Sequence, residues 1–164
     1  MIQKKICMVG ASRVGKTSLI SRFVRSIFSD IYHATIGVKI DKKSIIVGEQ
    51  EVNLMLWDIS EEEEFEKITS TYLQGAAGYI LVVDGTRQET LNKAISLQAK
   101  VEGVLGPVPF ILMINKSDLE EQWEVTPEMT NQLTERGWTV MQGSAKTGLG
   151  VEDAFQTLGK AMLA

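Results

Sequence analysis

Short apolar runs alternate along the chain with segments in which apolar residues recur at helical spacing. Uninterrupted apolar runs occupy residues 6–9, 79–83 and 110–114. A run without polar interruption is typical of a parallel strand that is buried on both faces. Shorter apolar segments at 52–56 and 139–141 predict two more strands of the same sheet.

The segment 36–47 differs from these runs because lysines and an aspartate interrupt its middle. Lysine on an outer strand discourages pairing with another molecule, so we expect this strand at an edge of the sheet. Gly48, Glu49 and Gln50 would then turn the chain into the next strand as a hairpin.

The segments between the strands predict helices. Residues 19–28 and 151–162 each place their apolar side chains on one helical face, and a further helix is expected at about 90–104. Thr126 and Pro127 read as the N-cap and first position of another helix, which Gly137 ends.

This alternation predicts an α/β fold, with a doubly wound, mostly parallel six-stranded sheet and helices on both faces. Ligands bind such folds outside the carboxyl ends of the strands. A site is therefore expected in the loops after residues 9, 57, 83, 114 and 141.

Composition narrows the class of protein. A length of 164 residues predicts one domain over 1–164, and 44% hydrophobic with 23% charged residues excludes a disordered chain. A net charge of −4 does not favour electrostatic binding of nucleic acid or of an anionic membrane. The single cysteine, Cys7, is expected in the core of a protein from a reducing compartment, and the predicted location is cytoplasmic.

The loop after the first strand reads Gly10-Ala11-Ser12-Arg13-Val14-Gly15-Lys16-Thr17, followed by Ser18. This pattern, between a strand and a helix, is the phosphate loop of nucleotide-binding proteins. In such a loop the backbone N–H groups would converge on phosphate oxygens, Lys16 would reach the β- and γ-phosphates, and the Thr17 hydroxyl would bind Mg²⁺. We predict nucleotide contacts from Gly10, Arg13, Val14, Gly15, Lys16, Thr17 and Ser18. The alternative is a glycine turn that opens a helix, with Lys16 in solvent.

Two later loops predict recognition of a base. Asn115-Lys116-Ser117-Asp118 follows the apolar run 110–114, and the Asp118 carboxylate can accept hydrogen bonds from N1–H and the exocyclic amino group of guanine. Lys116 can cover a base face, and Asn115 can join neighbouring loops. Ser144-Ala145-Lys146 follows the last strand, and the Ala145 N–H could meet the guanine carbonyl oxygen. The simpler interpretation of residues 115–118 is a turn capped by Asn and Asp.

Together these motifs resemble the Ras-like small GTPases, which are P-loop NTPases with a small G-domain. The resemblance covers nearly the whole chain, and residues 34–38 with Ser12 are most similar to the Rab branch. It implies a switch that binds GTP or GDP with Mg²⁺. It also assigns Phe28 to the base, Thr35 to Mg²⁺ and the γ-phosphate, and Asp58 to Mg²⁺ through a water.

The motif that follows Trp57-Asp58 departs from the family pattern. Glu61 replaces the glycine whose N–H meets the γ-phosphate, and Glu62 replaces the glutamine that orients the attacking water. We therefore expect slow hydrolysis of GTP. The alternatives are a pseudo-GTPase that holds nucleotide and acts as an interaction module, and, against the indication from Asp118, a P-loop ATPase or nucleotide kinase.

The residues expected to act in hydrolysis are Lys16, Thr35, the altered Glu62 and, as an arginine finger supplied in cis, Arg13. Protein effectors and regulators are expected at switch I (30–40) and switch II (59–74), and a partner strand at the edge segment 38–47. No lipid anchor is evident, since no cysteine lies near Ala164, so the protein is expected to be soluble or to have a tail that this sequence lacks.

Overall fold

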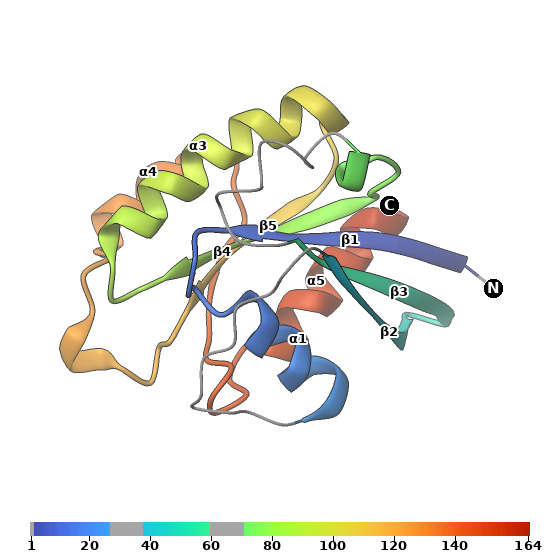
Figure 1. The fold of residues 1–164 in the computed structure, drawn as a ribbon, viewed down its shortest axis with the longest axis horizontal. Helices are drawn as coiled ribbons and strands as arrows, with labels where there is room; N and C mark the ends of the chain where they lie inside the picture. The colour runs from blue at the N-terminus through green and yellow to red at the C-terminus, as the bar shows by residue number, and fades with distance from the viewer. Residues whose placement is uncertain (1, 27–37, 60–70) are drawn as a thin grey trace.

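The structure is a computed structural model that describes residues 2–26, 38–59 and 71–164 (Figure 1). Its strands are β1 (Ile2–Gly10), β2 (Val38–Val47), β3 (Gln50–Ile59), β4 (Gly78–Asp84), β5 (Phe110–Asn115) and β6 (Val140–Gln142). Its helices are α1 (Lys16–Arg25), α3 (Gln88–Leu105), α4 (Pro127–Glu135) and α5 (Val151–Leu163), with a 3₁₀ turn at Glu120–Gln122. In this part of the chain, no helix has the length and apolar character needed to cross a membrane.

The strands form one six-stranded sheet in the order β2-β3-β1-β4-β5-β6. β2 runs antiparallel to β3, and every other neighbouring pair is parallel. Val47 pairs with Gln50 across a tight hairpin turn, where Gly48 has a φ of 64°. A left-handed residue suits such a turn, and glycine adopts that conformation without a Cβ clash. The predicted edge strand, hairpin and mostly parallel sheet are confirmed.

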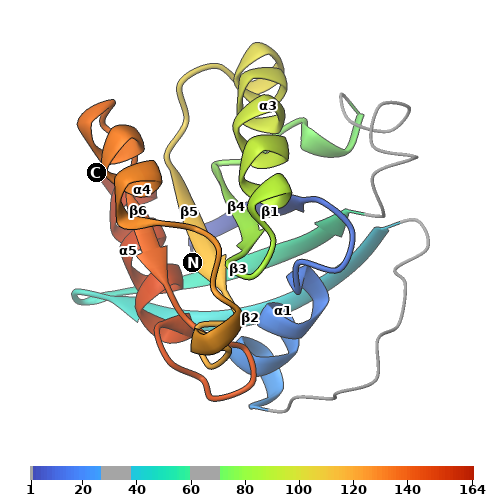
Figure 2. The same ribbon diagram turned by 90° about the vertical axis from the view of Figure 1, so that its left-hand side faces the viewer.

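Helices cover both faces of the sheet, as predicted. α1 and α5 pack on one face, where the rings of Phe23 and Phe155 stack with centroids 3.9 Å apart. α3 and α4 cover the other face, and there the rings of Tyr79 and Phe110 stack at 5.0 Å (Figures 1 and 2). Cys7 belongs to this second core and is fully buried, which raises the pKa of its thiol to about 12.

The ends of the elements differ from the sequence prediction in places. The helix predicted to reach residue 28 ends at Arg25, because Ser26 takes a left-handed φ of 57° and its N–H closes the helix on the Arg22 carbonyl. β2 begins at Val38, and residues 36–37, where the sequence predicts the start of this strand, lie outside the described residues. The predicted start of α4 is confirmed, since the Thr126 hydroxyl accepts the Met129 N–H at 3.3 Å and Pro127 is the first helical residue.

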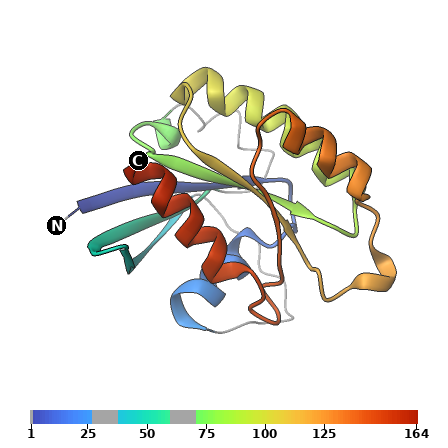
Figure 3. The same ribbon diagram turned by 180° about the vertical axis from the view of Figure 1, so that it is seen from behind.

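The parallel strands bring their carboxyl ends to one edge of the sheet. The strand register pairs Met8 with Asp58, and Asp84 with Asn115. The β1–α1 loop, the start of α3 and the loops after β5 and β6 therefore meet at this edge, which Figure 3 shows from behind. This is the edge at which the sequence predicts a site.

Candidate functional site

The phosphate loop needs glycine at both of its ends. A Cβ on Gly10 would lie 2.5 Å from the Val82 carbonyl oxygen. Gly15 has a φ of 104°, and a Cβ there would lie 2.2 Å from Nδ2 of Asn115. The glycines predicted from the motif thus allow the loop to pass close to β4 and to the loop after β5.

Lys16 is the first residue of α1 and is buried. Its Nζ donates a hydrogen bond to the Gly10 carbonyl oxygen at 2.8 Å, so the side chain folds back across the phosphate loop. The first turn of α1 contains no acidic residue. The positive end of the helix dipole and a buried ammonium group therefore meet at one point, an arrangement that favours an anion.

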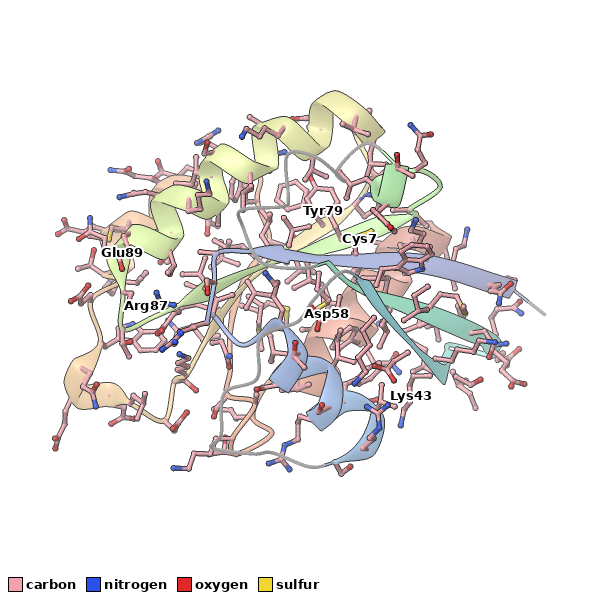
Figure 4. The ribbon with its side chains drawn as sticks, viewed as in Figure 1. Cys7, Lys43, Asp58, Tyr79, Arg87 and Glu89 are labelled. Carbon is pink, nitrogen blue, oxygen red and sulfur yellow. The ribbon has the colours of Figure 1, made fainter. Side chains whose placement is uncertain are left out.

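Thr17 of α1 contacts Asp58 of β3, the residue labelled in Figure 4. The Thr17 hydroxyl donates to Oδ2 of Asp58, and the Asp58 side chain is buried. Oxygen ligands of this kind fit Mg²⁺, which takes one or two protein ligands and completes its shell with phosphate and water. The described residues contain no cluster of three or more His, Cys, Asp or Glu side chains suited to a metal held by protein alone.

Asn115 joins two loops that are far apart in the sequence. Its Nδ2 donates to the Val14 carbonyl at 2.9 Å, and its Oδ1 accepts the Ala145 N–H at 3.0 Å. The residue is 2% exposed, so these bonds are shielded from water. The expectation that Asn115 joins neighbouring loops is confirmed. The Ala145 N–H, expected to face a base, here donates to Asn115.

Asp118 lies exposed at the start of the loop after β5. Ser144 fixes its orientation, because the Ser144 hydroxyl donates to Oδ1 of Asp118 at 2.6 Å. The same hydroxyl accepts the Thr147 N–H at 3.1 Å. The Asn-Lys-Ser-Asp and Ser-Ala-Lys motifs therefore form one bonded unit that presents a carboxylate to solvent. Lys146, the last residue of the second motif, is exposed.

A buried carboxylate that sequence reasoning missed lies at the end of β4. Asp84 is 2% exposed, and its Oδ2 receives hydrogen bonds from Lys116 Nζ at 2.8 Å and Arg87 Nε at 3.0 Å. Thr86 donates to its Oδ1 from both the backbone N–H and the hydroxyl. Burial alone would raise the pKa of Asp84, but the bonds from Lys116, Thr86 and Arg87 outweigh it and hold the pKa below its usual value.

The two cations at Asp84 also reach the phosphate loop. Lys116 Nζ donates to the Arg13 carbonyl at 2.9 Å, and Arg87 Nη2 donates to the Ser12 carbonyl at 2.8 Å. Figure 4 shows Arg87 close to the start of α3. The sequence did contain an indication of Asp84, because this acidic residue ends the apolar run of β4. In the strand register it pairs with Asn115, which ends β5. Nothing in the sequence distinguishes Arg87 from a surface arginine.

The remaining predicted residues fall into two groups. Val14 is buried in the core, Ser18 is half-buried in α1, and Arg13 is exposed with a left-handed φ of 63°. Phe28, Thr35, Glu61 and Glu62, together with most of the two switch segments, lie outside the described residues. Their roles and the arginine finger stay predictions.

Comparison with known proteins agrees with this geometry. The sequence model of the Ras family matches residues 5–164. The chain is 32% identical over 161 residues to the Ras-related protein Rab-13 of Bos taurus, across 97% of this chain and 79% of the relative. It is 36% identical over 153 residues to the Ras-related protein Rab-4 of Dictyostelium discoideum, across 92% of this chain and 75% of the relative. The chain therefore belongs to the Ras family of small GTPases and is similar to its Rab branch.

Proposed function

We propose that the chain is a guanine-nucleotide switch that binds GTP and GDP with Mg²⁺ and hydrolyses GTP slowly. The observation that carries this proposal is the pair of hydrogen bonds made by Asn115, to Val14 in the phosphate loop and to Ala145 in the loop after β6. They hold a loop suited to phosphate and a loop suited to a base in one fixed arrangement. A nucleotide carries a phosphate group at one end and a base at the other, so it can contact both loops at once.

The phosphate groups would lie against the backbone of the phosphate loop and the start of α1. Lys16 supplies a fixed positive charge there, because its bond to the Gly10 carbonyl holds the ammonium at the helix N-terminus. Thr17 and Asp58 would hold Mg²⁺, which neutralises phosphate charge when it is bound.

The base would be selected by Asp118. Its exposed carboxylate, oriented by Ser144, can accept both N1–H and the 2-amino group of guanine. Adenine offers neither donor in this geometry, so its binding would leave the carboxylate without these bonds and cost about 1–3 kcal/mol. The Ala145 N–H would add a contact to the guanine 6-oxo group, shared with or taken from Asn115.

Slow hydrolysis follows from the altered residues of switch II. An ionised Glu62 cannot donate a hydrogen bond to the γ-phosphoryl group, and its charge repels that group. Glu61 lacks the conformational freedom of the glycine it replaces. These two substitutions also favour the second candidate function, a pseudo-GTPase that retains nucleotide and acts through its partners.

We infer that effectors and regulators would bind the switch segments 30–40 and 59–74 and the neighbouring edge strand. Two observations on β2 support a partner surface there. β2 lies at the edge of the sheet, and the apolar side chain of Ile40 on this strand is 46% exposed. In the register, Ile40 pairs with Trp57 of β3, so the apolar surface extends across both strands.

Loading with GTP tests the proposal. The chain is incubated with GTP and Mg²⁺, excess nucleotide is removed, and the bound nucleotide is followed by chromatography for several hours. Gradual conversion to GDP supports a slow GTPase. GTP that stays bound and intact supports the pseudo-GTPase instead, and a chain that retains no guanine nucleotide contradicts both functions.

A further inference from the structure

Arg22 links the helix of the phosphate loop to the loop after β6. It lies in α1, and its Nε donates to the Ala145 carbonyl at 2.7 Å. Its Nη2 donates to the next carbonyl along the chain, that of Lys146. One planar guanidinium group therefore holds two consecutive backbone carbonyls, a geometry that lysine cannot reproduce with a single ammonium group.

Arg22 and Asn115 both form hydrogen bonds with the backbone of Ala145. Asn115 accepts the N–H of Ala145, which belongs to the peptide plane before the Ala145 Cα. Arg22 bonds the carbonyl of Ala145, which belongs to the plane after it. Since each peptide unit is planar, fixing both planes fixes the two backbone torsions of Ala145. Arg22 thus restrains the direction in which the Ala145 N–H points.

The local packing makes this restraint stiff. Gly148, which continues the loop, has a φ of 89°, and a Cβ placed there would lie 3.7 Å from Cδ of Arg22. The arginine stem therefore passes directly under the loop. A third, longer contact of 3.5 Å joins Nη1 to the Ser26 carbonyl at the end of α1, so the guanidinium is also held from its own helix.

We propose that Arg22 is a positioning residue for base recognition, which holds the Ala145 N–H where it can be shared between Asn115 and the 6-oxo group of a bound guanine. This inference rests on the proposed function, in which that N–H contacts the base. An arginine that served only to close α1 would stabilise the chain without affecting which base it prefers. Arg22 affects the contact at position 6 of guanine, because it bonds the loop that carries the Ala145 N–H and not only its own helix.

The test compares GDP with 6-thio-GDP, in which sulfur replaces the 6-oxo oxygen. The thio analogue keeps N1–H and the 2-amino group for Asp118, but its sulfur is a weak hydrogen-bond acceptor. The ratio of the two dissociation constants therefore measures the contact at position 6. We expect the wild-type chain to bind GDP more tightly than 6-thio-GDP. In the Arg22→Ala chain the ratio of the two dissociation constants should shrink by about fivefold, which corresponds to the free energy of one hydrogen bond.

Arg25→Ala is the matched control, because Arg25 lies on the same helix and pairs with Asp41 of β2 rather than with the base loop. It should leave the GDP to 6-thio-GDP ratio unchanged. Arg22→Lys, which retains one of the two carbonyl bonds, should give an intermediate ratio and guards against a poorly folded alanine variant. An Arg22→Ala or Arg22→Lys chain that binds GDP with the wild-type ratio overturns the inference. A wild-type chain that binds neither nucleotide instead overturns the proposed function.

Discussion

Lys116 Nζ lies 2.8 Å from Oδ2 of Asp84, so the Asn-Lys-Ser-Asp motif is fixed to a buried carboxylate at the end of β4. The same ammonium holds the Arg13 carbonyl, and Arg87, the second cation at Asp84, holds the Ser12 carbonyl. One buried carboxylate therefore organises two bonds to consecutive residues of the phosphate loop. Asp84 itself lies outside the phosphate-loop motif of residues 10–17.

Replacing Asp84 with asparagine should loosen the phosphate loop. The amide keeps the size of the side chain but removes the charge that binds Lys116 and Arg87. Hydrogen bonds to charged groups contribute about 1.5–3 kcal/mol, so we expect the free energy of unfolding to fall by about that amount. Dissociation of GDP, followed with a fluorescent analogue, should become about tenfold faster.

Glu89→Gln is the control for this variant, because Glu89 is 78% exposed and lies 3.9 Å from the same arginine. It should change the free energy of unfolding by no more than about 0.5 kcal/mol. If Asp84→Asn released GDP no faster than Glu89→Gln, the bonds at Asp84 would have no part in holding the loop.

The stability lost in Asp84→Asn should depend on pH. The pKa of Asp84 is lowered in the folded chain by Lys116, Thr86 and Arg87, against the raising effect of burial. A lowered pKa gives stability that is complete above the unfolded pKa of about 3.9 and is lost as the pH falls toward the folded pKa. Urea unfolding of both chains should therefore show a constant difference at pH 6–8 that shrinks below about pH 4.

Gly15→Ala should abolish nucleotide binding through a clash with Asn115. A Cβ at Gly15 would lie 2.2 Å from Asn115 Nδ2, and the φ of 104° adds backbone strain. Gly137→Ala separates these effects, since Gly137 has a φ of 91° but no atom within 4 Å of a Cβ. Strain alone costs about 1–3 kcal/mol, so Gly137→Ala should lower the melting temperature and still bind GDP. Retained binding in Gly15→Ala would show that the Asn115 contact is not needed.

Asp118→Asn should shift the base preference from guanine toward xanthine. The carboxylate accepts from N1–H and the 2-amino group, whereas an amide can donate to the 2-oxo group of xanthine. The bond from Ser144 to Oδ1 can be retained by the amide oxygen. We expect the ratio of GDP to XDP affinity, measured by competition, to fall by about 100-fold or more. An unchanged ratio would mean that Asp118 does not contact the base.

Glu62→Gln should accelerate hydrolysis of bound GTP. Glutamine can orient water and donate to the γ-phosphoryl group, and it removes a negative charge beside the phosphates. Single-turnover hydrolysis should rise at least tenfold, and the GTP dissociation constant should fall, because a charge that repels the γ-phosphate is removed. Glu64→Gln, at a neighbouring acidic position, should leave the rate unchanged. An equal rate in the Glu62→Gln and wild-type chains would show that Glu62 is not the cause of slow hydrolysis.

Sequence reasoning predicted the sheet, its antiparallel edge strand and the meeting of the phosphate and base motifs. These features depend on hydrophobic periodicity and on loops whose composition has a direct chemical reason, such as glycine at 10 and 15. The sequence also indicated that Asn115 can join neighbouring loops, and the structure adds that its amide is buried, where it needs hydrogen-bond partners.

The long arginine and lysine contacts were not predictable in the same way. Arg22 bonds residues that are 123 and 124 positions away, and Arg87 bonds Ser12 at a separation of 75. No local pattern distinguishes such an arginine from one on a solvated helix face, because the partner is a backbone carbonyl with no sequence signature. The left-handed Ser26 that ends α1 likewise has no glycine to mark it.

Calorimetric titration of the nucleotide-free chain tests whether this edge of the sheet binds a guanine nucleotide. GDP and ADP are titrated separately in the same buffer with Mg²⁺. We expect GDP to bind at one site per chain and at least about 100-fold more tightly than ADP. Equal affinity for the two nucleotides, or no heat of binding with GDP, would contradict this expectation.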